Sequence, residues 1–176
     1  MPENVDAFDR YPVRTVLLSN LSVVAVWAIG AYLLWVALGV IGAVAFIIYC
    51  AVLEVNLLKK SCVNCYYYGR TCFSGRGRVC ARLFKSGDPA RFTAREISWK
   101  DIVPDLAVSF VPLICGIGLI VVDFSWLIVV LVLALLALST AGNALIRGRL
   151  ACKHCRQRLL GCPAEKLFSS RSAESG

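Results

Sequence analysis

Hydrophobic residues gather in two long blocks that are separated and flanked by polar segments. The first block runs roughly from Thr15 to Leu58 and the second roughly from Ile102 to Ile146. Each block has about 45 residues, more than twice the roughly 20 that one helix needs to cross a bilayer, so each predicts two helices joined by a tight turn. The expected turns are residues 38–42 in the first block and 123–125 in the second. The predicted spans are 15–37, 41–58, 104–122 and 126–146.

The composition agrees with this pattern. Hydrophobic residues make up 59% of the chain, charged residues only 17%, and the mean hydropathy is +0.72. These values lie far from those of ordinary soluble domains. Acidic residues (Glu3, Asp6 and Asp9) stand where a cleavable signal peptide carries basic ones, so the first span is expected to be retained.

A spacing of cysteines occurs twice, each time after a hydrophobic block. Cys62-x2-Cys65-x6-Cys72 is followed 90 residues later by Cys152-x2-Cys155-x6-Cys162. A shift of 90 residues also places the first hydrophobic block on the second, which indicates an internal duplication. The predicted fold class is therefore an all-α integral membrane protein, with four transmembrane helices arranged as two duplicated hairpins, each followed by a cytoplasmic cysteine-rich metal-binding segment.

The central polar segment also contains a helix start. Asp88 is suited to cap a helix and Pro89 to occupy its first position. The apolar residues from Phe92 to Ile102 predict a short helix along the membrane interface. The expected domain organisation is a cytoplasmic arm (1–14), hairpin 1 (15–58), a cysteine-rich loop with the interfacial helix (59–101), hairpin 2 (102–147), a second cysteine-rich segment (148–168) and a disordered tail (169–176).

The basic residues predict the orientation of the chain. The net charge is +8, and the 19 Lys and Arg residues lie in the N-terminal arm, the central segment and the C-terminal segment, with none in the two predicted turns. Lys and Arg close to the spans favour the cytoplasmic side. We therefore expect a multi-pass protein of the cell membrane with both termini and both cysteine segments in the cytoplasm, where the basic loops also contact anionic lipid.

A cytoplasmic location favours metal binding over disulfides, because that compartment is reducing. The predicted metal ligands are Cys62, Cys65, Cys72, Cys80, Cys152, Cys155 and Cys162. Two arrangements fit. In one, the first four form a complete site and the last three take a fourth ligand from elsewhere or leave a position open. In the other, the two Cys-x2-Cys turns share one metal, as in rubredoxin-like and zinc-ribbon sites.

The cofactor is expected to be zinc or an iron–sulfur cluster, with metal-free thiol chemistry as a third interpretation. His154 lies between two predicted ligands, where its ring has difficulty reaching the same metal. As the only histidine, and outside the spans, it also argues against a b-type haem. Cys50 and Cys115 lie within spans and are interpreted as small hydrophobic residues.

The predicted function is that of a membrane-anchored metal-binding adaptor or assembly subunit, with membrane lipid and a protein or membrane complex as partners. The alternative is an iron–sulfur electron-transfer subunit. A metal or solute transporter ranks third, because the spans carry few polar groups. No nucleic-acid partner and no catalytic residue are expected. The segment from Cys72 to Arg78 fits the Cys-x5-Arg pattern of cysteine-dependent phosphatases, but a 43-residue segment is too short for their catalytic domain.

Overall fold

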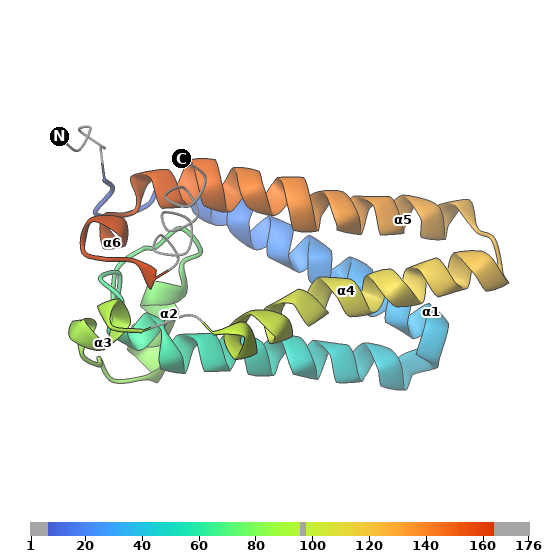
Figure 1. Cartoon of the computed structure of the whole chain (residues 1–176), viewed down its shortest axis with the longest axis horizontal. Coiled ribbons are helices and arrows are strands. Elements are labelled where there is room, and N and C mark those ends of the chain that lie inside the picture. The colour runs from blue at the N-terminus through green and yellow to red at the C-terminus, as the bar shows by residue number, and fades with distance from the viewer. Residues whose placement is uncertain (1–6, 96–97, 164–176) are drawn as a thin grey trace, which may run out of the picture. The chain divides into compact units, whose positions relative to one another are not determined.

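The computed structural model describes residues 7–95 and 98–163, and every regular element in these ranges is a helix (Figure 1). The chain divides into two compact units. The helical unit comprises Leu18–Val55 and Trp99–Ile146. The cysteine unit comprises the described parts of Met1–Leu17, Asn56–Ser98 and Arg147–Gly176. It therefore collects segments from before, between and after the two hydrophobic blocks.

Three helices are long and apolar enough to cross a membrane, spanning Val13–Asn64, Trp99–Val122 and Trp126–His154. Large apolar side chains on these helices are widely exposed, with Val121 and Val122 more than four-fifths exposed. A water-soluble protein seldom exposes such continuous apolar surface, whereas lipid covers it in a bilayer. The length and composition of these helices are those of a helical membrane protein.

The first of these helices, α1 (Val13–Lys60), reverses direction at Gly39 (Figure 1). Gly39 has φ 73° and ψ −166°, a backbone region that only glycine adopts readily. The two arms of α1 pack against each other, since Leu34 on one arm forms a buried cluster with Phe46 and Cys50 on the other. Gly39 lies inside the predicted turn of residues 38–42.

The helices α4 (Trp99–Val122) and α5 (Trp126–Ala137) are separated by residues 123–125, which confirms the second predicted turn. The helix that begins as α5 continues through two π-helical segments, Leu138–Gly142 and Ala144–Ala151. Side chains from α1 and α5 form the main core of the helical unit, made of Leu33, Ile128, Val132 and Leu135.

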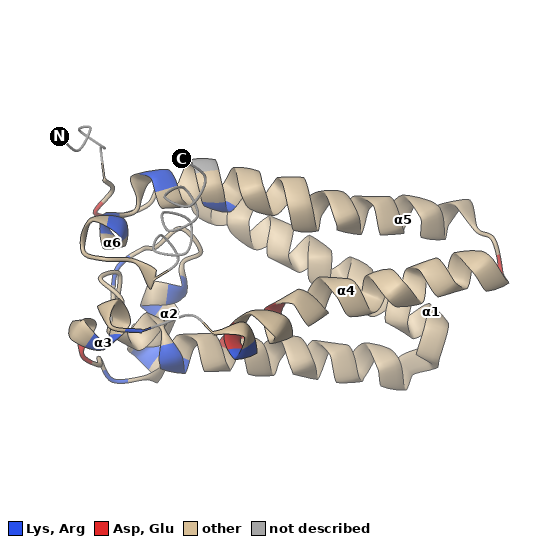
Figure 2. Ribbon diagram, in the orientation of Figure 1, with Lys and Arg blue, Asp and Glu red and all other residues tan. Residues whose placement is uncertain are grey.

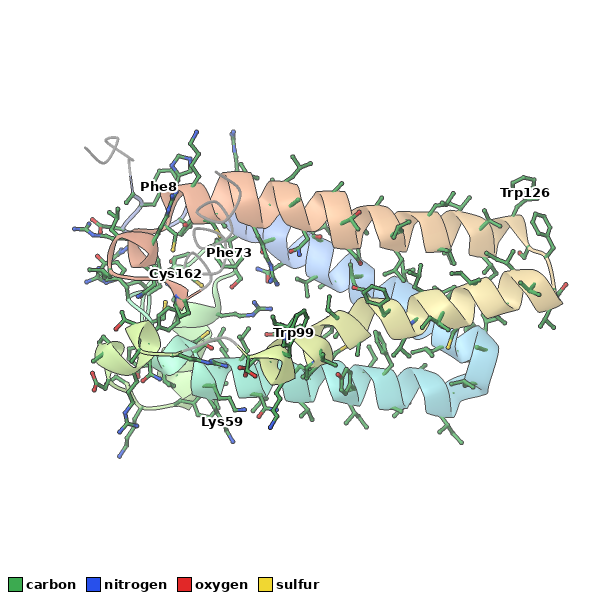
Figure 3. The ribbon with its side chains drawn as sticks, in the orientation of Figure 1. Phe8, Lys59, Phe73, Trp99, Trp126 and Cys162 are labelled. Atoms are coloured by element: carbon green, nitrogen blue, oxygen red, sulfur yellow. The ribbon has the colours of Figure 1, made fainter. Side chains whose placement is uncertain are left out.

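Side-chain hydrogen bonds join neighbouring helices of the helical unit. The Ser139 hydroxyl hydrogen-bonds the Ser109 hydroxyl at 2.9 Å, and the Tyr49 hydroxyl donates to the carbonyl oxygen of Pro104, also at 2.9 Å. Such bonds between neighbouring helices are typical of membrane interiors. At the start of α5, Trp126 is 74% exposed, as expected of an aromatic residue at a membrane interface (Figure 3).

The predicted helix start at Asp88 is confirmed. The Asp88 carboxylate accepts a hydrogen bond of 2.9 Å from the Ala90 N–H, and Pro89 is the first helical residue of α3 (Pro89–Thr93). The helix is shorter than expected, because Trp99 and Ile102 belong to the start of α4. A row of apolar residues looks the same in an interfacial helix and in the first turns of a membrane helix. Residues 96–97 and the predicted tail (169–176) lie outside the described residues.

Basic residues are divided sharply between the two units (Figure 2). The sequence of the helical unit contains a single basic residue, Lys100, near the beginning of α4. All other Lys and Arg residues belong to the cysteine unit.

Candidate metal centre

The two Cys-x2-Cys sequences form the same backbone turn. In the first, Cys62–Asn64 is a short 3-10 helix and the Cys65 N–H donates to the Cys62 carbonyl oxygen at 3.3 Å. In the second, Cys152–His154 is a short 3-10 helix and the Cys155 N–H donates to the Cys152 carbonyl oxygen at 3.2 Å. Both Cys65 and Cys155 then continue in extended conformation. We call these two turns the cysteine turns.

Each cysteine turn also directs a backbone donor at its second sulfur. Burial raises the pKa of Cys65 and of Cys155, and hydrogen bonding from the backbone of Tyr67 and of Gln157, respectively, opposes this rise. Both donors stand two residues after the cysteine that accepts. Hydrogen bonds of this kind favour the thiolate, which is the form that binds metals.

The two cysteine turns pack directly against each other through a reciprocal pair of hydrogen bonds. The Tyr66 N–H donates to Oε1 of Gln157 at 2.7 Å, and the Arg156 N–H donates to the Tyr67 hydroxyl at 3.0 Å. Tyr66 corresponds to Arg156, and Tyr67 to Gln157, under the 90-residue shift. The accepting side chains are almost fully buried, Tyr67 at 3% exposed and Gln157 at 4%. Equivalent positions of the two sequences therefore exchange equivalent hydrogen bonds.

The third cysteine of the first sequence lies in a loop that leads into α2 (Arg76–Leu83). The Cys72 sulfur accepts a hydrogen bond from the Gly77 N–H at 3.4 Å and lies 3.5 Å from the Ser74 hydroxyl. Gly77 packs so closely that an added Cβ atom would lie 2.1 Å from the Tyr67 carbonyl oxygen. The absence of a side chain at Gly77 therefore lets α2 approach the first cysteine turn.

Two further cysteines complete the set in the cysteine unit. Cys80 lies on α2, is fully buried, and directs its thiol at the Leu58 carbonyl oxygen at 3.7 Å. Cys162 follows the short helix α6 (Arg156–Leu159) and Gly161, whose φ of 98° requires glycine. Cys162 is half-buried in the cysteine unit (Figure 3).

The thiols of the cysteine unit interact electrostatically in two groups. Burial, followed by the charges of Cys72 and Cys80, raises the pKa of Cys62 to about 12. Burial raises the pKa of Cys152, with further contributions from Cys155 and Cys162. Each of these two thiols therefore has its strongest thiol neighbours within its own repeat.

Cys65 belongs to both groups. Burial raises its pKa to about 11, the Tyr67 N–H opposes this, and the charges of Cys155, Cys72 and Cys162 raise it further. Its thiol neighbours thus come from both repeats.

The N-terminal arm joins the two cysteine turns, a role that sequence reasoning missed. The Phe8 N–H donates to the His154 carbonyl oxygen at 3.0 Å, and the Tyr67 hydroxyl donates to the Phe8 carbonyl oxygen at 2.7 Å. Tyr11 is buried, donates its hydroxyl to the Ala151 carbonyl oxygen at 2.6 Å and its N–H to the Thr71 carbonyl oxygen at 3.0 Å. In the sequence, this role is indicated by two aromatic residues, Phe8 and Tyr11, that stand in a polar arm.

Comparison of the chain with protein-family models, curated proteins and solved structures finds no match.

The seven predicted ligands all lie in the cysteine unit, and all nine cysteines are free thiols. Among residues 7–95 and 98–163, however, no three His, Cys, Asp or Glu side chains converge closely enough to hold a metal ion. Binding a metal would require the thiols to turn towards one another. The remaining two cysteines behave as hydrophobic residues, since Cys50 is buried beside Leu34 and Phe46, with Cys115 packed against them.

Proposed function

We propose that this chain is a membrane-anchored metal-binding protein whose cysteine unit holds zinc through thiolates and serves as an adaptor or assembly subunit of a membrane complex. The observation that carries the proposal is the reciprocal pair of hydrogen bonds between Tyr66 and Gln157 and between Arg156 and Tyr67. These bonds bring two cysteine turns of the same geometry together. Paired Cys-x2-Cys turns are the usual frame of a thiolate metal site.

The cysteine unit has little else to stabilise it. Among its described residues the buried apolar side chains are few, namely Tyr11, Leu58, Tyr67, Cys80 and Ala151. A small unit with such a core usually needs disulfides or a metal. Disulfides are absent, since every cysteine is a free thiol. Metal binding adds its own free energy to folding, and zinc with four thiolates does so without any redox role.

The composition of the cysteine unit supports four membrane crossings. Its segments come from before, between and after the two hydrophobic blocks. A compact unit lies on one side of a bilayer, so each block must cross an even number of times. The reversal at Gly39 and the break at residues 123–125 supply the two returns. The duplicated hairpins expected from the sequence have this topology.

Charge supports a cytoplasmic location for the cysteine unit. It carries every Lys and Arg except Lys100. Positive residues beside spans stay in the cytoplasm, where thiols remain reduced and able to bind metal. The same charges suit an acidic partner or anionic lipid. The polar groups of the helical unit bond each other, as Ser109 and Ser139 do, which fits an anchor better than a transport path.

The test is metal analysis and visible absorption of protein purified without oxygen in detergent. We expect colourless protein with bound zinc. Cys62→Ser and Cys152→Ser should each lose metal, whereas the matched variant Cys50→Ala, which alters a thiol of the helical unit, should keep it. Brown protein that contains iron and acid-labile sulfide would contradict the zinc adaptor and favour the iron–sulfur electron-transfer subunit. Protein without metal would overturn the proposal.

A further inference from the structure

The N-terminal arm is bound along the second cysteine turn as an extended segment. Phe8 pairs with Cys155 in a parallel β-bridge, and its N–H donates to the His154 carbonyl oxygen at 3.0 Å. The Phe8 carbonyl oxygen accepts from the Tyr67 hydroxyl at 2.7 Å. Both polar groups of the Phe8 backbone are therefore recognised, as they are when a peptide binds by adding a strand to a protein surface.

The side chain of Phe8 occupies an aromatic site. Its ring stacks on the ring of His154, with centroids 4.8 Å apart and planes inclined at 25°. The ring of Tyr11 meets it edge-on, with centroids 5.6 Å apart. Because aromatic rings in these two arrangements attract each other beyond the burial of their area, the site favours an aromatic residue in the bound segment.

The next residue of the arm, Asp9, occupies a site for a carboxylate. Its side chain accepts a hydrogen bond of 2.9 Å from the Tyr66 hydroxyl and forms an ion pair with Arg156. The guanidinium groups of Arg70 and Arg156 both lie over the Tyr66 ring, 4.7 and 5.5 Å from its centroid. The hydrogen bond from Tyr66 and the charges of both arginines lower the pKa of the Asp9 carboxyl. The site therefore favours an ionised carboxylate.

The contacts of Asp9 hold the arm weakly. The side chains of Asp9 and Arg156 are 64% and 45% exposed, and an ion pair in contact with water contributes little stability. Tyr11, by contrast, is buried and bonds the cysteine unit through its own hydroxyl and N–H. Phe8 and Asp9 can therefore leave the surface that they cover while Tyr11 stays in place.

We propose that the surface covered by Phe8 and Asp9 is a docking site for an extended segment of a partner protein, in which an aromatic residue precedes Asp or Glu, and that the N-terminal arm blocks this site until the partner displaces it. The inference rests on the proposed adaptor function and deepens it by giving the chemistry of the partner. An acidic segment also suits the charge of the cysteine unit, which carries every Lys and Arg except Lys100.

The test is the binding of a fluorescent synthetic peptide with the sequence of residues 3–10 to full-length protein in detergent, measured by fluorescence anisotropy. In the wild-type chain the arm competes with the peptide. The combined substitutions Phe8→Ala and Asp9→Lys remove this competition, and we call this chain the open variant. If the arm covers the site for about nine-tenths of the time, the peptide binds about tenfold more tightly to the open variant. The same peptide carrying Asp9→Lys should bind neither protein.

A charge exchange keeps the proposal testable if the open variant does not fold. Arg156→Glu should bind the peptide carrying Asp9→Lys more tightly than the original peptide, a reversal of preference that unfolding cannot produce. Arg91→Glu makes the same change of charge on α3 and should keep the wild-type preference. Equal binding of the original peptide to the wild type and the open variant, or no binding to either, would overturn the proposal.

The outcomes separate this inference from the function on which it rests. Zinc is measured on the same samples, so a failure of peptide binding in protein that contains zinc would overturn the docking site alone. Protein without zinc would overturn the metal-binding function whether or not the peptide binds. A wild-type dimer that becomes a monomer in the open variant would make the arm of a second copy the occupant, and would overturn the partner segment.

Discussion

Tyr67 and Gln157, which stand 90 residues apart, each accept through their side chain the backbone N–H that precedes the other. Gln157 accepts from Tyr66 at 2.7 Å, and Tyr67 accepts from Arg156 at 3.0 Å. Both acceptors are buried, so water cannot replace them. The packing of the two cysteine turns therefore depends on a phenol in one sequence and an amide in the other.

Replacing the amide should loosen this packing. Gln157→Ala leaves the Tyr66 N–H without its acceptor, and an unpaired buried donor costs about 1–3 kcal/mol. We expect faster hydrogen exchange at the Tyr66 amide and a lower unfolding temperature of the cysteine unit. Gln157→Glu keeps an oxygen acceptor of the same length and serves as the control for the exchange rate. Unchanged exchange in Gln157→Ala would contradict this role.

Gly77→Ala should disrupt the cysteine unit far more strongly. The new Cβ atom would lie 2.1 Å from the Tyr67 carbonyl oxygen and 2.5 Å from that of Arg70, and neither backbone atom moves cheaply. We expect the free energy of unfolding to fall by about 3 kcal/mol or more, because the substitution overpacks the site and breaks backbone contacts. Maleimide labelling of Cys80, which is buried, should become rapid.

The control for this substitution is Gly118→Ala in α4. A Cβ atom there meets nothing within 4 Å, and alanine is favoured over glycine within a helix by roughly 0.5–1 kcal/mol. Cys80 labelling should stay slow in this variant. Slow labelling in Gly77→Ala as well would show that α2 can move away from the first cysteine turn without unfolding.

The metal-free protein should lose stability in alkali. Burial raises the pKa of Cys62 to about 12 from an ordinary value near 9. The folded state thus favours the neutral thiol, and this contribution is complete below about pH 9 and disappears as the pH rises through 12. Denaturant titrations of chelator-treated protein should show a falling free energy of unfolding from pH 9 upwards. Cys62→Ala should make this decline shallower without removing it, because Cys65 and Cys152 also have raised pKa values. An equally steep decline would refute the role of Cys62.

The four-crossing topology predicts opposite labelling of two serines. Ser125→Cys lies in the turn between α4 and α5, and Ser86→Cys lies in the cysteine unit before α3. An impermeant maleimide added to intact cells should label Ser125→Cys only, and should label Ser86→Cys only after lysis. The wild-type chain supplies the background. Reversed labelling would invert the orientation, and labelling of both in intact cells would show that α4 does not cross the membrane.

Much of the helical unit could be predicted, because its signals are local. Apolar length predicts membrane helices, and glycine predicts the reversal at Gly39. In the cysteine unit, Asp88 with Pro89 likewise marks a helix start. The length of α3 could not be predicted in this way. A row of apolar residues does not show where one helix stops and the next begins.

The arrangement of the cysteine unit was less accessible to sequence reasoning. The cysteine spacing identifies which residues belong together, but not which sulfurs approach across repeats. The contacts of Tyr11 and Phe8 join residues up to 146 positions apart in the chain, such as Phe8 and His154. Tyr67, in the middle of a run of three tyrosines, is buried and bonds the N-terminal arm, a contact that no local pattern indicates.

The N-terminal arm lies between cysteine turns that are made from the middle and the end of the chain. During synthesis, Phe8 and Tyr11 therefore emerge from the ribosome long before His154 and Ala151, the partners they bond. The helices enter the membrane while the cysteine unit is still incomplete. Its thiols then stay uncovered until the second cysteine turn has been made, so that turn decides whether the whole unit closes.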